Sequence, residues 1–358
     1  MGKKICRIWV VLFLFYVLVA GCSQKVETKV PQQPYRVGVI DSVNYGAGTT
    51  YIHLMDENLK ETEVLESPYH ALGSFGSAPV QVLDGMVYEK SVGDINKYNK
   101  CAVTAMDMKT GEWKDYPYKG EGGLQDFRIN ENGLFMLGNI NYDTYVDYHS
   151  FEDGEDATIK IEGVSGVSIS VDGYDVYFLD EDLEGIEGSL YRVNVKDQSQ
   201  EKILDTTGEL EDSALSYTLW HDGRMYIPNG DKLSVYDPAE NTLSHIPLPG
   251  QYAAQVVSDK EKVYVIDCDM EHLGETEVYC LNPKTEEIEA EYHFAESVLQ
   301  SYIEDGVYYM LQQDPQALVC KYELLPDGSC RKLGESLVGE KKDDNYRISD
   351  MFLSPIYR

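Results

Sequence analysis

The sequence predicts an all-β fold, specifically a β-propeller of seven four-stranded blades closed by its N- and C-terminal strands. Three observations support this prediction. A turn-forming pair followed by a short β-rich run recurs along the chain, a second turn-rich hairpin follows each copy, and helical periodicity is almost absent. The alternatives for such a repeat are two stacked β domains or a ring of eight blades.

The first repeated feature is an Asp-Gly or Asn-Gly turn that is soon followed by an aromatic residue. One further copy, at Lys260 and Glu261, lacks the glycine. The aromatic residues are 47, 42, 49, 38 and 45 positions apart, which is close to the length of a four-stranded blade. We expect them to pack inside the blades. They are Tyr88, Phe135, Tyr177, Tyr226, Tyr264 and Tyr309.

The second repeated feature is a hairpin whose centre is rich in Asp, Asn, Pro and Gly, the residues that supply tight-turn conformations. Seven such hairpins indicate seven blades, with centres at 55–58, 107–111, 151–154, 195–197, 237–241, 282–285 and 325–328.

The first blade lacks a strand, because only residues 37–40 precede its hairpin at 50–65. The C-terminal stretch Asn345 to Ser349 is similar to the expected inner strand from Asp126 to Asn130. We therefore predict that the C-terminal segment returns to pair with the first blade, which removes two open sheet edges.

From residue 35 to residue 355, the repeat resembles bacterial β-propellers of the TolB-like, WD-like and quinoprotein-repeat types. Ser168 to Phe178 is similar to the TolB-type repeat, and Ala105 to Trp113 matches the tryptophan-docking motif of quinoprotein propellers. This second match implies that Trp113 packs between blades, and no quinone site follows from it. The resemblance also implies a binding or assembly role, as is common for exported lipoproteins with such propellers.

The N-terminus has the pattern of an export signal. Lys3, Lys4 and Arg7 precede a short apolar run, and the segment Leu18 to Cys22 resembles the bacterial lipobox. We predict a signal peptide at 1–21, lipidation of Cys22, a flexible tether at 22–34 and a propeller domain at 35–355. The domain would lie outside the cytoplasm, held to a bacterial membrane by its lipid. The alternative is an ordinary signal or membrane anchor that happens to contain Cys22.

The composition is strongly acidic, with 62 acidic and 30 basic residues and a formal charge of −32. This charge argues against nucleic acid or an anionic membrane surface as the main partner and favours cationic or metal-bearing ones.

The cysteines and catalytic motifs give little support to an enzyme. Cys268 and Cys280 lie symmetrically about Gly274, so either a cross-strand disulfide or two buried thiols fit. Signatures of nucleophile-elbow hydrolases, zincins and nucleotide-binding loops are absent, and the histidines are dispersed. We predict no catalytic residue and no cofactor. The acidic segment from Asp180 to Glu184 leaves a calcium ion as the alternative, although Tyr191 occupies the place of the final ligand.

Tyrosine is the more informative residue type, with 28 copies against nine phenylalanines, because a phenol suits wet binding surfaces. Some tyrosines fall in predicted loops on one face of the ring. Between blades these loops would include Tyr69, Tyr217 and Tyr252. The candidate ligand-binding residues are Tyr45, Tyr98, Tyr142, Tyr145, Asp94, Asp143 and Asp182.

Together these features predict a lipid-anchored module that binds a protein, peptide or glycan through its loops. One alternative is a carbohydrate-active hydrolase or lyase whose carboxylates line the channel mouth. Another is an envelope-assembly scaffold, which would dock partners through a broad apolar or β-edge patch.

Overall fold

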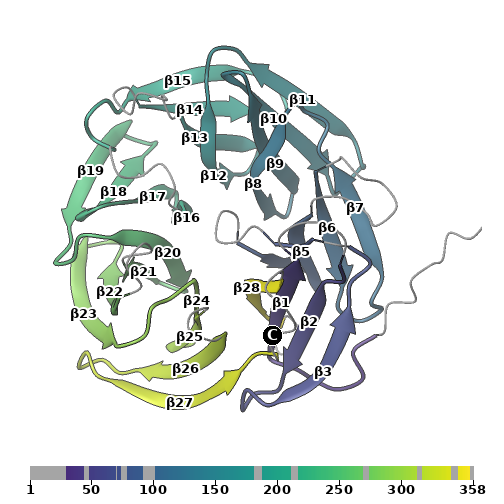
Figure 1. The fold of residues 1–358 in the computed structure, drawn as a ribbon. Helices are drawn as coiled ribbons and strands as arrows, with labels where there is room; N and C mark the ends of the chain where they lie inside the picture. Colours follow the sequence, from purple (N-terminus) through teal and green to yellow (C-terminus); the bar gives the residue numbers. More distant parts are fainter. Residues whose placement is uncertain are drawn as a thin grey trace, which may run out of the picture.

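The computed structural model describes residues 30–43, 48–69, 71–73, 79–91, 101–180, 188–210, 217–268, 274–312, 317–339 and 346–354. Seven four-stranded antiparallel sheets are arranged as the blades of a ring (Figure 1). This confirms the predicted fold class and rules out the two-domain and eight-blade alternatives. Within the described ranges, no helix is long and apolar enough to cross a bilayer.

The blades are numbered here along the chain, and their strands are given from the ring axis outwards. Blade 1 contains β28 (Tyr346–Leu353), β1 (Val37–Val43), β2 (Tyr51–Met55) and β3 (Glu61–Glu66). Blade 2 contains β4 (Gln81–Leu83), β5 (Met86–Ser91), β6 (Ala102–Asp107) and β7 (Trp113–Pro117). Blade 3 contains β8 (Gly123–Asn130), β9 (Gly133–Ile140), β10 (Asp143–Ser150) and β11 (Asp156–Ile161). Blade 4 contains β12 (Gly166–Asp172), β13 (Asp175–Asp180), β14 (Ser189–Asn194) and β15 (Gln200–Asp205).

The remaining three blades follow the same plan. Blade 5 contains β16 (Leu219–His221), β17 (Arg224–Asn229), β18 (Lys232–Asp237) and β19 (Thr242–Pro247). Blade 6 contains β20 (Ala253–Asp259), β21 (Lys262–Cys268), β22 (Thr276–Asn282) and β23 (Glu287–Phe294). Blade 7 contains β24 (Gln300–Glu304), β25 (Val307–Gln312), β26 (Leu318–Leu324) and β27 (Cys330–Leu337).

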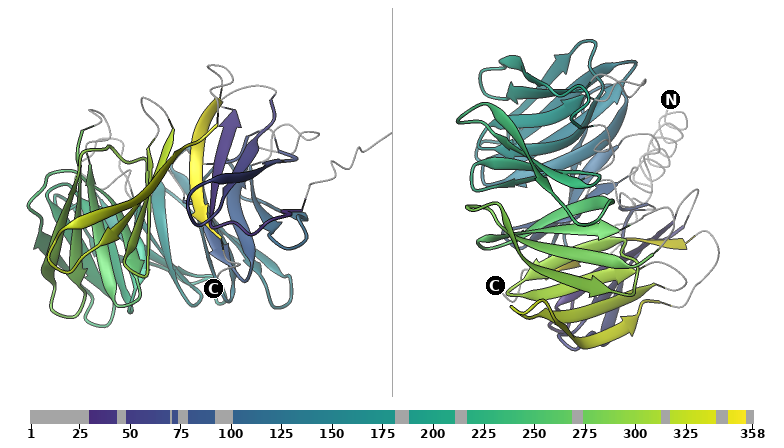
Figure 2. Two further views of the ribbon diagram at one scale, coloured as in Figure 1. Left: turned by 90° about the horizontal axis from the view of Figure 1, so that it is seen from below. Right: turned by 90° about the vertical axis from the view of Figure 1, so that its left-hand side faces the viewer.

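The ring is closed by the C-terminal strand, as the sequence predicts. β28 pairs antiparallel with β1 and occupies the innermost position of blade 1, with Gly38 opposite Phe352. In Figure 2 the yellow C-terminal strand lies beside a purple N-terminal strand. A Cβ atom at Gly38 would lie 2.1 Å from Cζ of Phe352, so the large ring requires a glycine opposite it. One blade is thus made from both ends of the chain, and the edges that β1 and β28 would each expose alone are paired with one another.

The repeated aromatic residues occupy one equivalent position. Each is the third residue of the second strand of its blade, and all six are buried. The turns before them have the conformation expected of tight hairpins, since Asp84 and Gly85 have φ values of 50° and 80°. The expected packing role of these aromatics is confirmed.

The seven second hairpins each join the third strand of a blade to its outermost strand, as predicted. Trp113 begins the outermost strand of blade 2, and its indole makes an edge contact with Tyr69 at a ring-centroid distance of 5.2 Å. Both side chains belong to the apolar core shared by blades 1 and 2, so Trp113 has the inter-blade packing role implied by its motif.

Polar side chains on the inner strands join neighbouring blades. Asp126, Gln255 and Gln300 occupy equivalent positions: each lies opposite the fifth residue of the second strand of its blade. The bonds run from Ile169 N to Asp126 Oδ2 (2.9 Å), from Gln255 Nε2 to Leu299 O (2.7 Å) and from Met351 N to Gln300 Oε1 (2.5 Å). These bonds pair backbone groups that no sheet ladder serves, and they tie blade 3 to blade 4, blade 6 to blade 7 and blade 7 to blade 1.

The disulfide alternative for Cys268 and Cys280 is wrong. β21 and β22 pair in a register that places Cys268 opposite Thr276 and Cys280 opposite Tyr264. The hairpin is therefore not symmetric about Gly274, and the two cysteines are not cross-strand neighbours. Both are buried in the apolar core shared by blades 6 and 7, where Cys280 behaves as a small apolar side chain.

Candidate functional site

The face of the ring that carries the loops is set by the strand order. Within each blade, the connection between the second and third strands emerges on the same face as the connections between blades. We call this the loop face. Four predicted binding residues, Tyr45, Asp94, Tyr98 and Asp182, lie outside the described residues.

Tyr142 occupies the tip of the β9–β10 hairpin on the loop face. Asn141 and Tyr142 have φ values of 50° and 64°, so both residues of this two-residue turn are left-handed. That conformation is unfavourable for a bulky residue. The Tyr142 side chain is 55% exposed and the neighbouring Ile140 is 38% exposed, so the turn presents an apolar tip to solvent.

The two other described candidates from this hairpin have structural partners. Asp143 forms an ion pair with Lys160 (2.8 Å) and accepts a hydrogen bond from the Gly163 amide (3.1 Å). The hydrogen bond from Lys160 lowers the pKa of the Asp143 carboxyl. Tyr145 is buried and its hydroxyl donates to Glu121 at 3.2 Å. Tyr145 lies inside β10, in a run of consecutive buried residues, whereas Tyr142 lies in the turn before that strand.

Tyr252 is a second exposed tyrosine of the loop face, in the connection from β19 to β20. Its side chain is 52% exposed. Its carbonyl accepts from the Cys268 amide (3.0 Å) and its own amide donates to Asp267 Oδ2 (3.1 Å). The sequence places Tyr252 between blades, but only the structure separates it from the many tyrosines that pack inside them.

Two buried aspartates, Asp147 and Asp267, each hold a loop-face connection by accepting backbone N–H groups. Asp147 accepts from Lys119 and from Gly120 (2.9 Å), and Asp267 accepts from Tyr252. Burial raises the pKa of Asp147, and it raises the pKa of Asp267 to about 6. These carboxylates fix loop backbone that has no strand to pair with.

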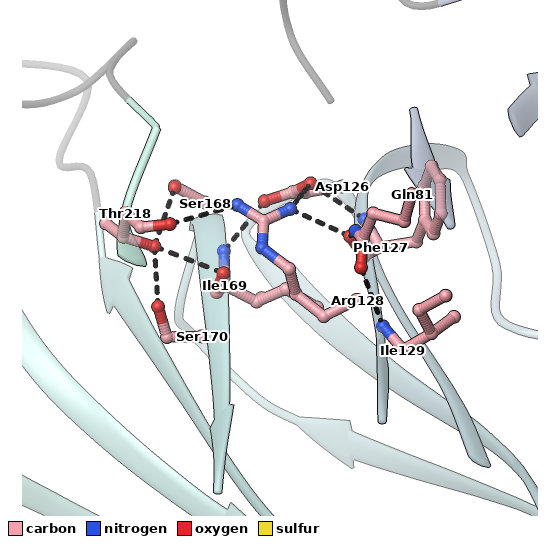
Figure 3. Close-up of polar contacts among 9 residues, drawn as sticks. All are labelled: Gln81, Asp126, Phe127, Arg128, Ile129, Ser168, Ile169, Ser170 and Thr218. Carbon is pink, nitrogen blue, oxygen red and sulfur yellow. Dashed lines mark hydrogen bonds and ion pairs between the residues drawn. The ribbon is translucent and has the colours of Figure 1, made fainter. Parts of the chain in front are cut away.

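A polar cluster joins the inner strands of neighbouring blades. Arg128 on β8 forms an ion pair with Asp126 (2.5 Å) and donates to the Phe127 carbonyl (2.7 Å). The same guanidinium reaches the Thr218 carbonyl, which precedes β16, at 3.4 Å (Figure 3). The Thr218 hydroxyl accepts from Ser170 (2.9 Å) and donates to the Ile169 carbonyl (3.1 Å). The inner strands of the consecutive blades 3, 4 and 5 are thereby joined.

Tyr302 makes a similar connection on the other side of the ring. Its hydroxyl, on β24 of blade 7, donates to the Val80 carbonyl of blade 2 at 3.0 Å and accepts from Gln300 at 3.1 Å. The bond passes the inner strand of blade 1, which lies between these blades in the ring order.

Glu89 and Asp350 form a buried carboxyl pair beside this cluster. Each is 1% exposed. Glu89 Oε1 accepts from the Lys90 amide at 2.7 Å, whereas Oε2 has no hydrogen-bond partner among the described residues. Burial and the Asp350 charge raise the pKa of Glu89 well above its usual value. Sequence analysis missed the pair because no motif marks it, and its two members lie far apart in the sequence.

Metal ligands are not grouped in the described part of the chain, where no set of three His, Cys, Asp or Glu side chains could hold an ion. Of the predicted calcium segment, only Asp180 lies within that part. Its carboxylate accepts from the Ser165 amide at 2.8 Å.

The sequence matches no protein-family model and none of the curated proteins. Its fold is similar to several solved structures. A putative 6-phosphogluconolactonase from Bacteroides uniformis has a TM-score of 0.60 and 13% identity, covering 90% of this chain and 100% of that one. A functionally unknown protein from Desulfotomaculum acetoxidans has a TM-score of 0.58 and 9% identity, covering 90% and 99%.

The computationally designed Ika8 protein is also similar, with a TM-score of 0.57 and 11% identity over 88% of this chain and 95% of that one. At such low identities the similarity extends to the fold alone, and the chain is a seven-bladed β-propeller.

Proposed function

We propose that this propeller is a lipid-anchored, extracytoplasmic module that binds a protein, peptide or glycan through its loop face. The observation that carries the proposal is the exposed Tyr142, held in an unfavourable backbone conformation at the tip of a hairpin whose strands are buried. A strained residue that contributes nothing to the core is typical of a functional position.

Two features of the described loop face support binding. Tyr142 and Tyr252 offer flat apolar surfaces with polar tips, which suit wet interfaces. Their loop stems are fixed by sheet ladders and buried aspartates, so ligand binding costs little additional conformational entropy.

The binding test compares the wild-type chain with the double variant Tyr142→Ala/Tyr252→Ala on a glycan array and a peptide array. We expect at least one ligand whose affinity falls about tenfold or more in the variant while the melting temperature stays unchanged. The matched control is Leu333→Ala, which removes a 45% exposed residue from within the outer strand β27, away from the loop face. Equal binding by all three chains would contradict the proposal.

The anchor is supported by the lipobox-like segment that ends at Cys22. Cells expressing the chain and fed an alkyne-bearing palmitate should incorporate the label, and Cys22→Ala should abolish the incorporation. Label retained in the variant would show that Cys22 is not the lipidation site.

A second candidate function is carbohydrate hydrolysis or lysis at the axis, favoured by one observation, the paired carboxyls of Glu89 and Asp350. A carboxyl with a raised pKa beside a second carboxylate is the arrangement that general acid catalysis uses. Turnover of oligosaccharides that is lost in Glu89→Gln would support this candidate. Both side chains are buried, so the candidate requires an opening of the ring centre and ranks second.

A further inference from the structure

We propose that Asp267 makes the loop face pH-responsive: the ionised carboxylate holds the backbone that presents Tyr252, and protonation releases it. The switch itself depends only on the contacts of Asp267. Its consequence for ligand binding rests on the proposed function of the loop face.

The connection that carries Tyr252 rests directly on the carboxylate. The Tyr252 amide donates to Asp267 Oδ2 at 3.1 Å. A Cβ atom at Gly250 would lie 2.1 Å from the same oxygen, so the backbone passes over it at a distance that only glycine permits. The Tyr252 carbonyl is bound in turn by the Cys268 amide at 3.0 Å. Losing the carboxylate bond would leave Tyr252 attached to β21 through its carbonyl only.

The groups around Asp267 favour the protonated form of its carboxyl, because its titratable neighbours include acidic side chains. On β22, Glu277 lies opposite Asp267 and accepts a hydrogen bond from Tyr279, whose hydroxyl also faces Gly250. On β23, His293 lies 3.9 Å from Glu277 and pairs with Glu275 at 3.5 Å. On β20, the residue opposite is Ala253. Among the described residues, no lysine or arginine forms an ion pair with Asp267.

These surroundings raise the pKa of the Asp267 carboxyl toward neutral pH. Burial is the main cause that raises the pKa of Asp267 to about 6. The hydrogen bond from the Tyr252 amide lowers this pKa, and the Glu277 charge raises it further. Above this pH the carboxylate accepts a charge-assisted bond, which is about twice as strong as a neutral one. Below it, the protonated carboxyl holds the amide more weakly, so Tyr252 is presented less rigidly.

Blade 3 repeats the device beside the other exposed tyrosine. Asp147 accepts the amides of Lys119 and Gly120, and burial raises its pKa as well. The same connection, between β7 and β8, packs against the Tyr142 hairpin, since a Cβ atom at Gly122 would lie 2.1 Å from the Asn139 carbonyl oxygen. Both exposed tyrosines of the described loop face therefore stand beside backbone that a buried aspartate holds.

The test is hydrogen exchange of the full chain in detergent, read at single-residue resolution by mass spectrometry between pH 5.0 and 7.5. After correction for intrinsic exchange, we expect the Tyr252 amide to exchange about tenfold faster at pH 5.0 than at pH 7.5, with a midpoint near 6. Asp267→Asn keeps an acceptor but cannot ionise, so it should remove this step. Asp231→Asn, at a nearby exposed turn, should retain it.

Two results would overturn the proposal. One is a Tyr252 amide whose corrected exchange rate shows no step in the wild type, or the same step in Asp267→Asn. The other is a parallel change at the buried Val265 of β21, which would indicate general loosening of the blade. Unchanged ligand binding by Tyr252→Ala would contradict the proposed function and leave the amide step intact, so the two failures are distinguishable.

Discussion

Arg128 and Thr218 lie 90 residues apart in the sequence, yet the guanidinium of the first donates to the carbonyl of the second at 3.4 Å. The bond joins blade 3 to blade 5 and passes the inner strand of blade 4. The same guanidinium neutralises the buried Asp126, so one side chain both joins two blades and balances a buried charge.

Replacing Arg128 should therefore be costly. Arg128→Met leaves the Asp126 carboxylate, whose side chain is 3% exposed, without its ion-pair partner, and we expect a loss of about 3 kcal/mol in unfolding free energy. Urea denaturation measures it. The control Arg192→Met breaks an exposed ion pair with Glu201 and should cost less than about 1 kcal/mol. Equal losses of unfolding free energy in the two variants would contradict the stabilising role of Arg128 between the blades.

Glu89 should make the fold less stable as the pH rises. Its pKa in the folded chain, raised by burial and by Asp350, exceeds the ordinary value of 4.5, so the folded state retains a proton that the unfolded state has lost. Stability then falls with increasing pH above 4.5 until the folded pKa is passed. Glu89→Gln should flatten this part of the melting-temperature profile. A profile identical to that of the wild type would contradict the prediction.

His53 should act in a pH window that begins higher than that of Glu89, at the ordinary histidine value of 6.5. Its imidazole lies 2.7 Å from Glu61 and 3.7 Å from Asp41, and it is buried. Burial alone would lower the pKa of His53, but the bonds to Asp41 and Glu61 outweigh it and raise the pKa above 6.5. The resulting stabilisation is complete below pH 6.5 and is lost as the pH rises through the higher folded value.

His53→Gln removes the titrating group, so the difference in melting temperature from the wild type should shrink as the pH rises above 6.5. A difference that stays constant with pH would show that His53 contributes by packing alone.

Ring closure can be tested at the pair Gly38 and Phe352. Gly38→Ala introduces a methyl group at 2.1 Å from the Phe352 ring and should destabilise the fold by about 1 to 3 kcal/mol. Phe352→Leu shortens the opposing side chain, so the double variant should be more stable than the sum of the single losses predicts. Strict additivity in this cycle would mean that the two side chains do not meet.

The repeat allowed the blade count and the ring closure to be predicted, because local chemistry dictates them. Asp-Gly turns such as Asp84 and Gly85 force tight hairpins wherever they occur, and the C-terminal strand completes a sheet that would otherwise have an open edge. These features depend on residues close in sequence or on a count of strands. The lipid anchor at Cys22 remains a prediction of the sequence.

The candidate site could be predicted only in part. Tyr142 and Tyr145 look equivalent in the sequence, but the first lies in the exposed hairpin turn and the second lies in β10, which neighbouring side chains bury on both faces. The pairing of Glu89 with Asp350 and the support of Tyr252 by Asp267 depend on which side chains the ring brings together. Sequence determined the architecture, because turns and strand periods are local; tertiary structure decided which residues meet, because burial and electrostatic coupling depend on distance in space.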